Sequence, residues 1–153
     1  MYDRILLPVD GSEGAKTAIE QAITHAQTYD AELHVLHVID QSAVELTTPS
    51  IEGISTDVVY EQLNEQGQAL VNEVTEETNE AGVTTTTEIV EYGSPYEEIQ
   101  SYAAEQDIDL IVIGTHGRSG LDRQLLGSVA EKVIRTAEVP VLAVQLDETP
   151  TTD

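Results

Sequence analysis

Glycines separate an apolar run from a helical pattern within residues 110–136. The run Leu110–Ile113 is followed by Gly114 and Gly117, and nine further residues lead to Gly127 and Ser128. Glycine has no Cβ, so its backbone can approach a ligand closely. The first turn of a helix presents unpaired N–H groups and the positive end of the helix dipole. A strand, a glycine loop and a helix start in this order therefore predict a phosphate-binding site.

The spacing of these glycines differs from that of two common phosphate loops. A P-loop has a lysine between its last glycine and the serine or threonine, whereas Ser128 follows Gly127 directly. The dinucleotide fingerprint G-x-G-x-x-G is shorter than G-x-x-G, nine residues, G-S. Turn chemistry explains each glycine by itself, but the set as a whole favours a nucleotide site.

This G-x-x-G, nine residues, G-S pattern resembles the ATP-binding motif of the universal stress protein family, in its ATP-binding branch. Ile5–Ser12 resembles the first strand of that family and its exit, His37–Asp40 the end of the second strand, and Val139–Val144 the last strand. The resemblance covers roughly residues 2–145 in order. It implies that the chain binds ATP, ADP or AMP, with Mg²⁺ as a possible companion of the nucleotide.

The resemblance also implies which residues form the nucleotide site. They are Pro8, Val9, Asp10, Val38, Ile113, Gly114, His116, Gly117, Arg118, Gly127, Ser128 and Val129. The glycines would let the backbone pass close to ribose and phosphate, and the N–H groups at the helix start would meet the phosphates. Asp10 would meet the ribose or a divalent ion on the phosphates, and Val38 would lie against the adenine.

Several of these residues have a structural explanation as well. Asp10 fits a turn, and Ser128 with Glu131 fits the S-x-x-E pattern of a capping box. Core packing explains the three apolar residues at strand ends, Pro8, Val38 and Ile113. Both interpretations stay open for each of these residues.

Few residues of the chain offer catalytic chemistry. Phosphoryl transfer needs a positioned nucleophile or water and cations that stabilise developing charge. The sequence has no P-loop lysine, and His116 is the single candidate for proton transfer, so no catalytic residue is assigned. We therefore expect an ATP-binding regulatory protein that acts as a nucleotide-dependent switch. A slow ATPase or self-phosphorylating protein is the first alternative, and a dimeric scaffold without nucleotide is the second.

The composition restricts the class and the partners of the protein. The chain has 153 residues and no cysteine, and we expect one domain over residues 1–146 and a polar tail over 147–153. No apolar run approaches a membrane span and no secretory signal precedes the first strand, so a cytoplasmic protein is expected. A net charge of -23 disfavours nucleic acid and anionic membranes, and it indicates adaptation to high salt, as in a halophilic archaeon.

Hydrophobic periodicity predicts alternating strands and helices. Strands are expected at Arg4–Val9, Glu32–Ile39, Thr84–Val90, Leu110–Ile113 and Val139–Val144, with helices between them and a long loop over Asp40–Ser55. Continuous apolar strands alternating with helices favour a doubly wound α/β fold, Rossmann-like or flavodoxin-like, with five parallel strands and helices on both faces. The resemblance implies the strand order 3-2-1-4-5. The first and fourth strands would then flank the point where ligands bind.

Two further expectations concern the second and last strands. His34 and His37 are three residues apart, so they point to opposite faces of the sheet, and both are interpreted as structural. In the family the last strand pairs with its copy in a partner subunit. Because Val139–Val144 would be an apolar edge strand, a homodimer through this strand is expected.

Overall fold

The computed structural model describes residues 2–10, 15–41, 56–115 and 128–145. Within these ranges strands and helices alternate along the chain. The strands are β1 (Arg4–Pro8), β2 (Glu32–Asp40), β3 (Thr85–Gly93), β4 (Leu110–Gly114) and β5 (Val141–Val144). The helices are α1 (Ala15–Tyr29), α3 (Thr56–Glu80), α4 (Pro95–Glu105) and α5 (Ser128–Thr136). None of these helices is long and apolar enough to span a membrane.

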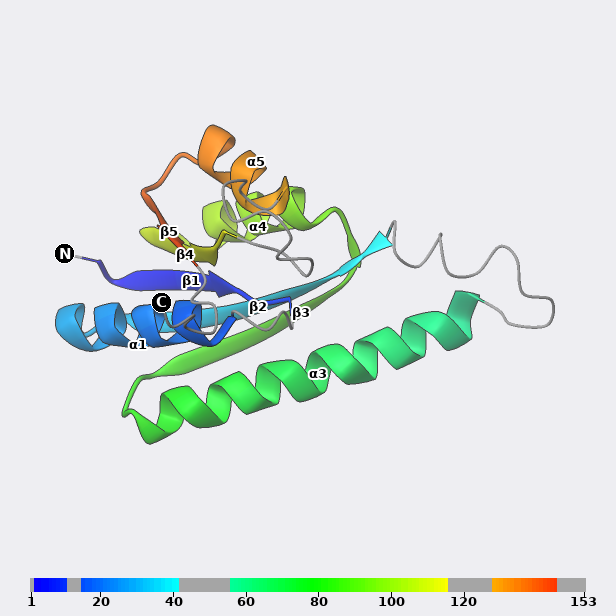
Figure 1. The fold of residues 1–153 in the computed structure, drawn as a ribbon, viewed down its shortest axis with the longest axis horizontal. Coiled ribbons are helices and arrows are strands. Elements are labelled where there is room, and N and C mark those ends of the chain that lie inside the picture. The colour runs from blue at the N-terminus through cyan, green and yellow to red at the C-terminus, as the bar shows by residue number, and fades with distance from the viewer. Residues whose placement is uncertain (1, 11–14, 42–55, 116–127, 146–153) are drawn as a thin grey trace, which may run out of the picture.

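All the described strands join one parallel sheet of five strands in the order β3-β2-β1-β4-β5 (Figure 1). The predicted fold class and strand order are thereby confirmed. The central strand β1 pairs Leu7 with Val35 of β2 and Leu6 with Ile111 of β4. The middle of β1 and most of β4 are buried, which explains why both read as continuous apolar runs.

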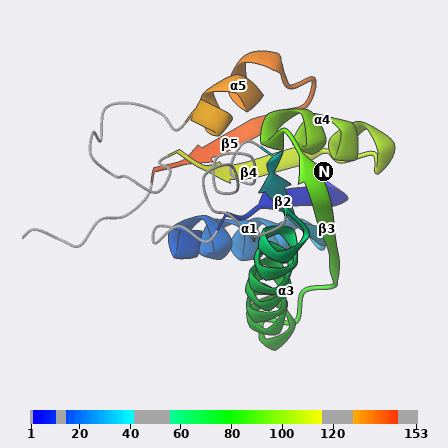
Figure 2. The same cartoon turned by 90° about the vertical axis from the view of Figure 1, so that its right-hand side faces the viewer.

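Helices cover both faces of the sheet, with α1 and α3 on one face and α4 and α5 on the other (Figures 1 and 2). Alternate residues along each strand enter opposite cores, as the pleat of a β-strand requires. Buried side chains on the α1–α3 face include Ile5, Leu7, Val9, Leu33, Val35 and Val112. Those on the α4–α5 face include Leu6, Leu36, Ile111 and Ile113.

The last strand is shorter than the sequence predicts. The expected span was Val139–Val144, whereas β5 begins at Val141 because the chain bends at residues 138 and 139. Pro140 has no N–H to donate to the sheet, so regular pairing starts after it. Its carbonyl still accepts the N–H of Ile111 at 3.0 Å, and this bond aligns β5 with β4.

Helix α3 ends just before Gly82, and strand β3 ends later than the sequence predicts. Gly82 follows α3 with φ +79°, a left-handed conformation that glycine adopts without strain. Strand β3 continues to Gly93, beyond the expected end at Val90, because it keeps pairing with β2 through a register shift before Asp40. The predicted polar tail and nearly all of the predicted long loop fall outside the described residues.

Candidate functional site

The exits of β1 and β4 lie side by side at the carboxyl edge of the sheet. These strands are paired neighbours, and they end at Pro8 and Gly114. From β1 the sheet continues to β2 and β3 on one side and to β4 and β5 on the other. Such a switch point is where open parallel sheets bind ligands. The structure therefore brings together predicted site residues that are more than 100 positions apart in the sequence.

The exit of β1 changes from a buried to an exposed environment within three residues. Pro8 is half-buried, Val9 is buried and Asp10 is exposed. The Val9 N–H donates to the carbonyl of Leu36 at 2.9 Å, so the chain stays attached to β2 for one residue beyond the strand. Asp10 is thus the first exposed side chain after β1 at this edge, and its contact with a ribose or a cation stays a prediction.

Three predicted site residues lie in one apolar cluster on the α4–α5 face of the sheet. Ile113 of β4 is buried in this cluster, and Val38 of β2 and Val129 of α5 are half-buried against it. Core packing, the structural explanation for Val38 and Ile113, is therefore correct. The two half-buried valines still have apolar surface outside the core, so packing does not exclude contact with a base.

Both ends of the glycine loop are anchored to the sheet or to a helix. After Gly114, the N–H of the buried residue Thr115 donates to the carbonyl of Val144 at 3.0 Å. At the other end, Ser128 is the first residue of α5, as the sequence predicts. The residues between these anchors lie outside the described part of the chain, so the roles of His116, Gly117, Arg118 and Gly127 stay predictions.

Two cations of α5 have partners within or beside that helix. The Nζ atom of Lys132 lies 4.9 Å from the ring centre of Tyr96, a cation–π contact that joins α5 to α4. Arg135, in the last turn, contacts the carboxylate of Glu131 at 3.5 Å between two exposed side chains. The first of these contacts lies in the middle of α5, and the second joins its last turn to Glu131 in its first turn. Among the described residues, no group of three His, Asp or Glu side chains is arranged to hold a metal ion.

His34 is the buried member of a partly buried polar network on the α4–α5 face. Its Nδ1 lies 2.7 Å from the hydroxyl of Tyr102, and its Nε2 lies 2.7 Å from a carboxylate oxygen of Glu32. Burial first, and the negative charges of Glu88 and Glu32 second, raise the pKa of Tyr102 to about 12. Because a carboxylate only accepts, Nε2–H donates to Glu32 and the Tyr102 hydroxyl donates to Nδ1 in the neutral ring. The predicted structural role of His34 is consistent with this network.

His37 lies on the other face of the sheet and contacts the candidate site. Its Nδ1 is 2.9 Å from the carbonyl oxygen of Val9, and the edge of its ring lies against Gly67 of α3. Sequence reasoning placed His37 on the correct strand but did not anticipate these contacts. The sequence offered one signal for these contacts, which is that His37 directly precedes the predicted site residue Val38. Consecutive residues near the end of a strand lie close to the same edge of the sheet, on opposite faces.

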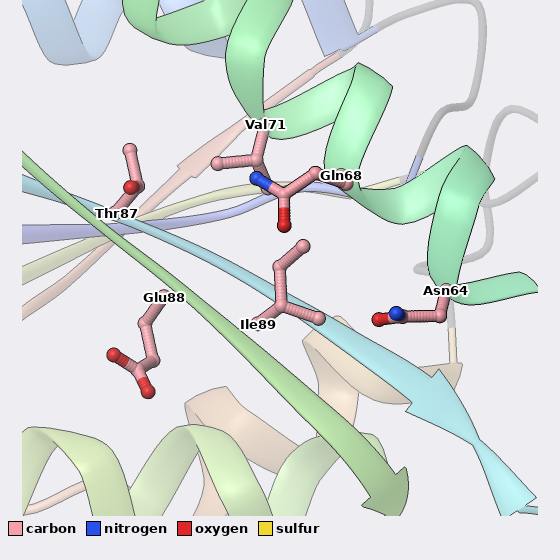
Figure 3. Close-up of a pocket in the computed structure, with 6 residues that line it drawn as sticks. All are labelled: Asn64, Gln68, Val71, Thr87, Glu88 and Ile89. Atoms are coloured by element: carbon pink, nitrogen blue, oxygen red, sulfur yellow. The ribbon is translucent and has the colours of Figure 1, made fainter. Parts of the chain in front are cut away.

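Two hollows among the described residues lie away from the β1–β4 exits. One lies between α3 and β3 and is lined by Asn64, Gln68, Val71, Thr87, Glu88 and Ile89 (Figure 3). In Figure 3 the Glu88 side chain points to the opposite side of β3, towards α4. The other lies at the amino edge of the sheet, between α1 and the starts of β1 and β2, and includes Arg4, Asp30, Glu32 and Thr84. Neither contains a residue of the predicted site.

Comparison with known proteins places this α/β domain in a family. The universal stress protein family matches residues 1–145. The chain is 42% identical over 145 residues to universal stress protein MJ0531 of Methanocaldococcus jannaschii. The matched region covers 95% of this chain and 83% of that protein. The solved structure of MJ0577, from the same organism, matches with a TM-score of 0.83 at 31% identity over 97% of this chain and 99% of that one. A universal stress protein solved in complex with cAMP matches with a TM-score of 0.71 at 26% identity over 95% of this chain and 99% of that one.

The strand order and the paired exits of β1 and β4 define a doubly wound α/β domain. The match along nearly the whole chain identifies it further. The chain belongs to the universal stress protein family.

Proposed function

We propose that this protein binds ATP at the exits of β1 and β4 and acts as a nucleotide-dependent regulatory switch. The observation that supports the proposal is that the paired strands β1 and β4 end side by side at Pro8 and Gly114, with Asp10 just beyond β1. A relative solved with cAMP supports an adenine nucleotide as the ligand. ADP and AMP offer the same base and ribose, so the test must compare all three.

The described residues suggest how the nucleotide would lie. The half-buried side chains of Val38 and Val129 offer apolar surface to the base, with Pro8 and the buried Ile113 nearby. Asp10 would meet the ribose, or a Mg²⁺ ion carried by the phosphates. The phosphates would lie at the first turn of α5, where the N–H groups of a nine-residue helix are unpaired and its dipole is positive.

The decisive test is equilibrium binding of ATP, ADP and AMP to the protein and to Gly117→Val. A branched side chain at a loop position that must approach the ligand should weaken ATP binding by about tenfold or more, which is about 1.4 kcal/mol. Thr86→Val, at an exposed position of the edge strand β3, replaces a hydroxyl by a methyl group far from the candidate site and should bind as the wild type does. Unchanged affinity in a folded Gly117→Val protein would place the nucleotide elsewhere, and no binding at all would favour the scaffold.

Turnover separates a switch from an enzyme. For a switch, Mg-ATP stays intact while it is bound. For a slow ATPase, ADP accumulates beyond one equivalent per subunit, and His116→Ala or Asp10→Asn stops it, since these side chains would orient water or hold the metal. Turnover that both substitutions abolish would overturn the switch proposal, whereas turnover that neither affects would indicate a contaminating ATPase.

We also propose that the protein is a homodimer paired through β5. This strand lies at one edge of the sheet, its residues Val141 and Leu142 are half-buried, and Ala143 is exposed. An apolar edge strand is a liability unless it is covered. Val141→Lys should therefore convert a dimer to a monomer in light scattering, while Thr86→Lys on the opposite edge strand should leave the mass unchanged. A dimer that persists in Val141→Lys would require another interface.

A further inference from the structure

The ring of His37 holds the backbone at the point where β1 gives way to the candidate site. The last regular pair between β1 and β2 is Pro8 with Leu36, and the Val9 N–H adds one more bond to the Leu36 carbonyl. The carbonyl of Val9 then receives the Nδ1 of His37 at 2.9 Å. A carbonyl can only accept, so Nδ1 carries the proton and a side chain continues the attachment of β1 to β2.

Helix α3 leaves room for this ring because residue 67 is glycine. A Cβ placed on Gly67 would lie 2.6 Å from Cδ2 and 3.1 Å from Nε2 of His37, which is too close for the ring to remain where it is. Glycine weakens the interior of a helix, and Gly67 lies near the middle of the 25-residue helix α3. Contact with His37 accounts for a residue that the helix alone would disfavour.

His37 also lies next to the residue predicted to meet the base. Val38 follows it on β2 and packs on the opposite face, with Ile113 and the α4–α5 core. A displacement of the His37 ring would therefore act on the carbonyl of Val9, one residue before Asp10, and on the strand segment that carries Val38. The ring connects α3 with two segments of the candidate site.

From these contacts we infer that His37 is a positioning residue for the nucleotide site. We also infer that Gly67, which has no Cβ, leaves the space in which the His37 ring lies. The inference rests on the proposed nucleotide function. Helix α3 and the exit of β1 are coupled through the His37 ring. A substitution that displaces this ring therefore alters nucleotide affinity even though the substituted residue does not contact the nucleotide. Nucleotide binding would in turn act on α3 through the same contact.

The first test concerns the proton on the ring. Nitrogen NMR of the protein labelled at histidine should show His37 with its proton on Nδ1. In Gly67→Ala the ring is displaced from the Val9 carbonyl, so the Nδ1–H signal should shift or disappear. A His37 ring protonated on Nε2 alone in the unsubstituted protein would overturn the inference, whatever the protein binds.

The second test is calorimetric titration of matched variants with Mg-ATP. Loss of one net hydrogen bond that orders the site should weaken binding about fivefold in His37→Leu. In His37→Asn the side-chain amide nitrogen takes the place of Nδ1, and affinity should return to within about twofold of the wild type. Equal losses in the Leu and Asn variants would show that ring packing alone matters and would overturn the positioning role.

Gly67→Ala supplies a variant in which His37 itself is unchanged. It should weaken ATP binding by a similar factor although alanine favours the helix, whereas Gln66→Ala, at the exposed neighbouring position of α3, should have no effect. In a His37→Ala background there is no ring to displace, so adding Gly67→Ala should change affinity no further. Wild-type affinity in Gly67→Ala would overturn the coupling alone, while a wild-type protein that binds no ATP would overturn the proposed function and this inference together.

Discussion

His34 and His37 are three residues apart on the same strand, yet they hold different parts of the molecule. His34 is almost fully buried at 3% exposure, and both of its partners, Tyr102 and Glu32, are side chains. His37 is half-buried, and its partner is the backbone carbonyl of Val9 at the carboxyl edge of the sheet. The His34 ring joins side chains within the core, whereas the His37 ring contacts the backbone at the exit of β1, beside the proposed nucleotide site.

The same contrast separates the two edges of the sheet. At the amino edge a carboxylate oxygen of Asp109 accepts the N–H groups of Asp3 and Arg4 at 2.9 and 3.0 Å, so backbone donors there already have partners. At the carboxyl edge Gly114 and the first turn of α5 flank the glycine loop. The comparison teaches that the position of a polar contact along a strand decides its role. Contacts towards the amino edge should govern stability, and contacts at the carboxyl edge should govern binding.

The largest effect that would test this contrast is expected from His34→Leu. The substitution removes both hydrogen bonds and leaves the part-buried hydroxyl of Tyr102 without its partner, which should cost about 2 kcal/mol of unfolding free energy. Urea unfolding measures this loss, and calorimetry should find ATP affinity unchanged within about twofold. The double variant with Tyr102→Phe should lose less than the sum of the single losses, because no orphaned hydroxyl remains. A large loss of ATP affinity in folded His34→Leu would remove the distinction between the two histidines.

A smaller effect on stability is expected from a change in salt concentration. This effect should not distinguish the amino edge of the sheet from the carboxyl edge. With 29 acidic and 6 basic residues, repulsion among carboxylates weakens the fold when counterions are scarce. Melting temperature should rise by about 3 °C or more between dilute buffer and molar KCl, corresponding to about 1 kcal/mol. Asp30→Asn, which removes one charge from the amino-edge hollow at a residue with φ 55° that asparagine tolerates, should reduce that rise slightly. A melting temperature that does not depend on salt would remove the proposed adaptation to high salt.

The smallest effect concerns Tyr102 at alkaline pH and sharpens the account of the His34 network. The pKa of this tyrosine is raised from 10.0 to about 12 in the folded protein, by burial first and by Glu88 and Glu32 second. Above pH 10 the unfolded chain therefore releases this proton while the folded protein keeps it, so the stability due to this group falls as pH rises towards 12. Unfolding free energies of the wild type should decline over this interval more steeply than those of Tyr102→Phe. Parallel declines would show that the hydroxyl is not buried as described.

Much of the fold could be predicted because its elements have strong local patterns. The buried runs of β1 and β4 required helices on both faces, and the family resemblance implied the order of the strands. The predicted start of β5 was wrong because the bend before Val141 depends on how Pro140 contacts the neighbouring strand β4. The apolar pattern of that segment, which runs through the proline, carries no information about such a bend.

Parts of the candidate site could be predicted where the residue type itself indicates a role, as for glycines at the end of a strand. They could not be predicted where the role depends on which distant residue is in contact. Glycines at a strand exit indicated the loop, and the structure places Gly114 and Ser128 at its two ends. The contact between His37 and Gly67 was not predictable, since it joins a strand and a helix that are 30 positions apart. A glycine inside a helix signals close packing, but the sequence does not say what packs against it.

The most direct test of the account is the response of backbone amides to Mg-ATP, followed by NMR titration. If the nucleotide binds at the exits of β1 and β4, the amide signals of Val9, Val38, Gly114 and Val129 should shift in a saturable manner. Signals from the amino edge, those of Arg4, Glu32, Thr84 and Asp109, should stay in place. Saturable shifts confined to the amino edge, or no shifts at any amide, would contradict the proposal that this protein binds ATP at the carboxyl edge of its sheet.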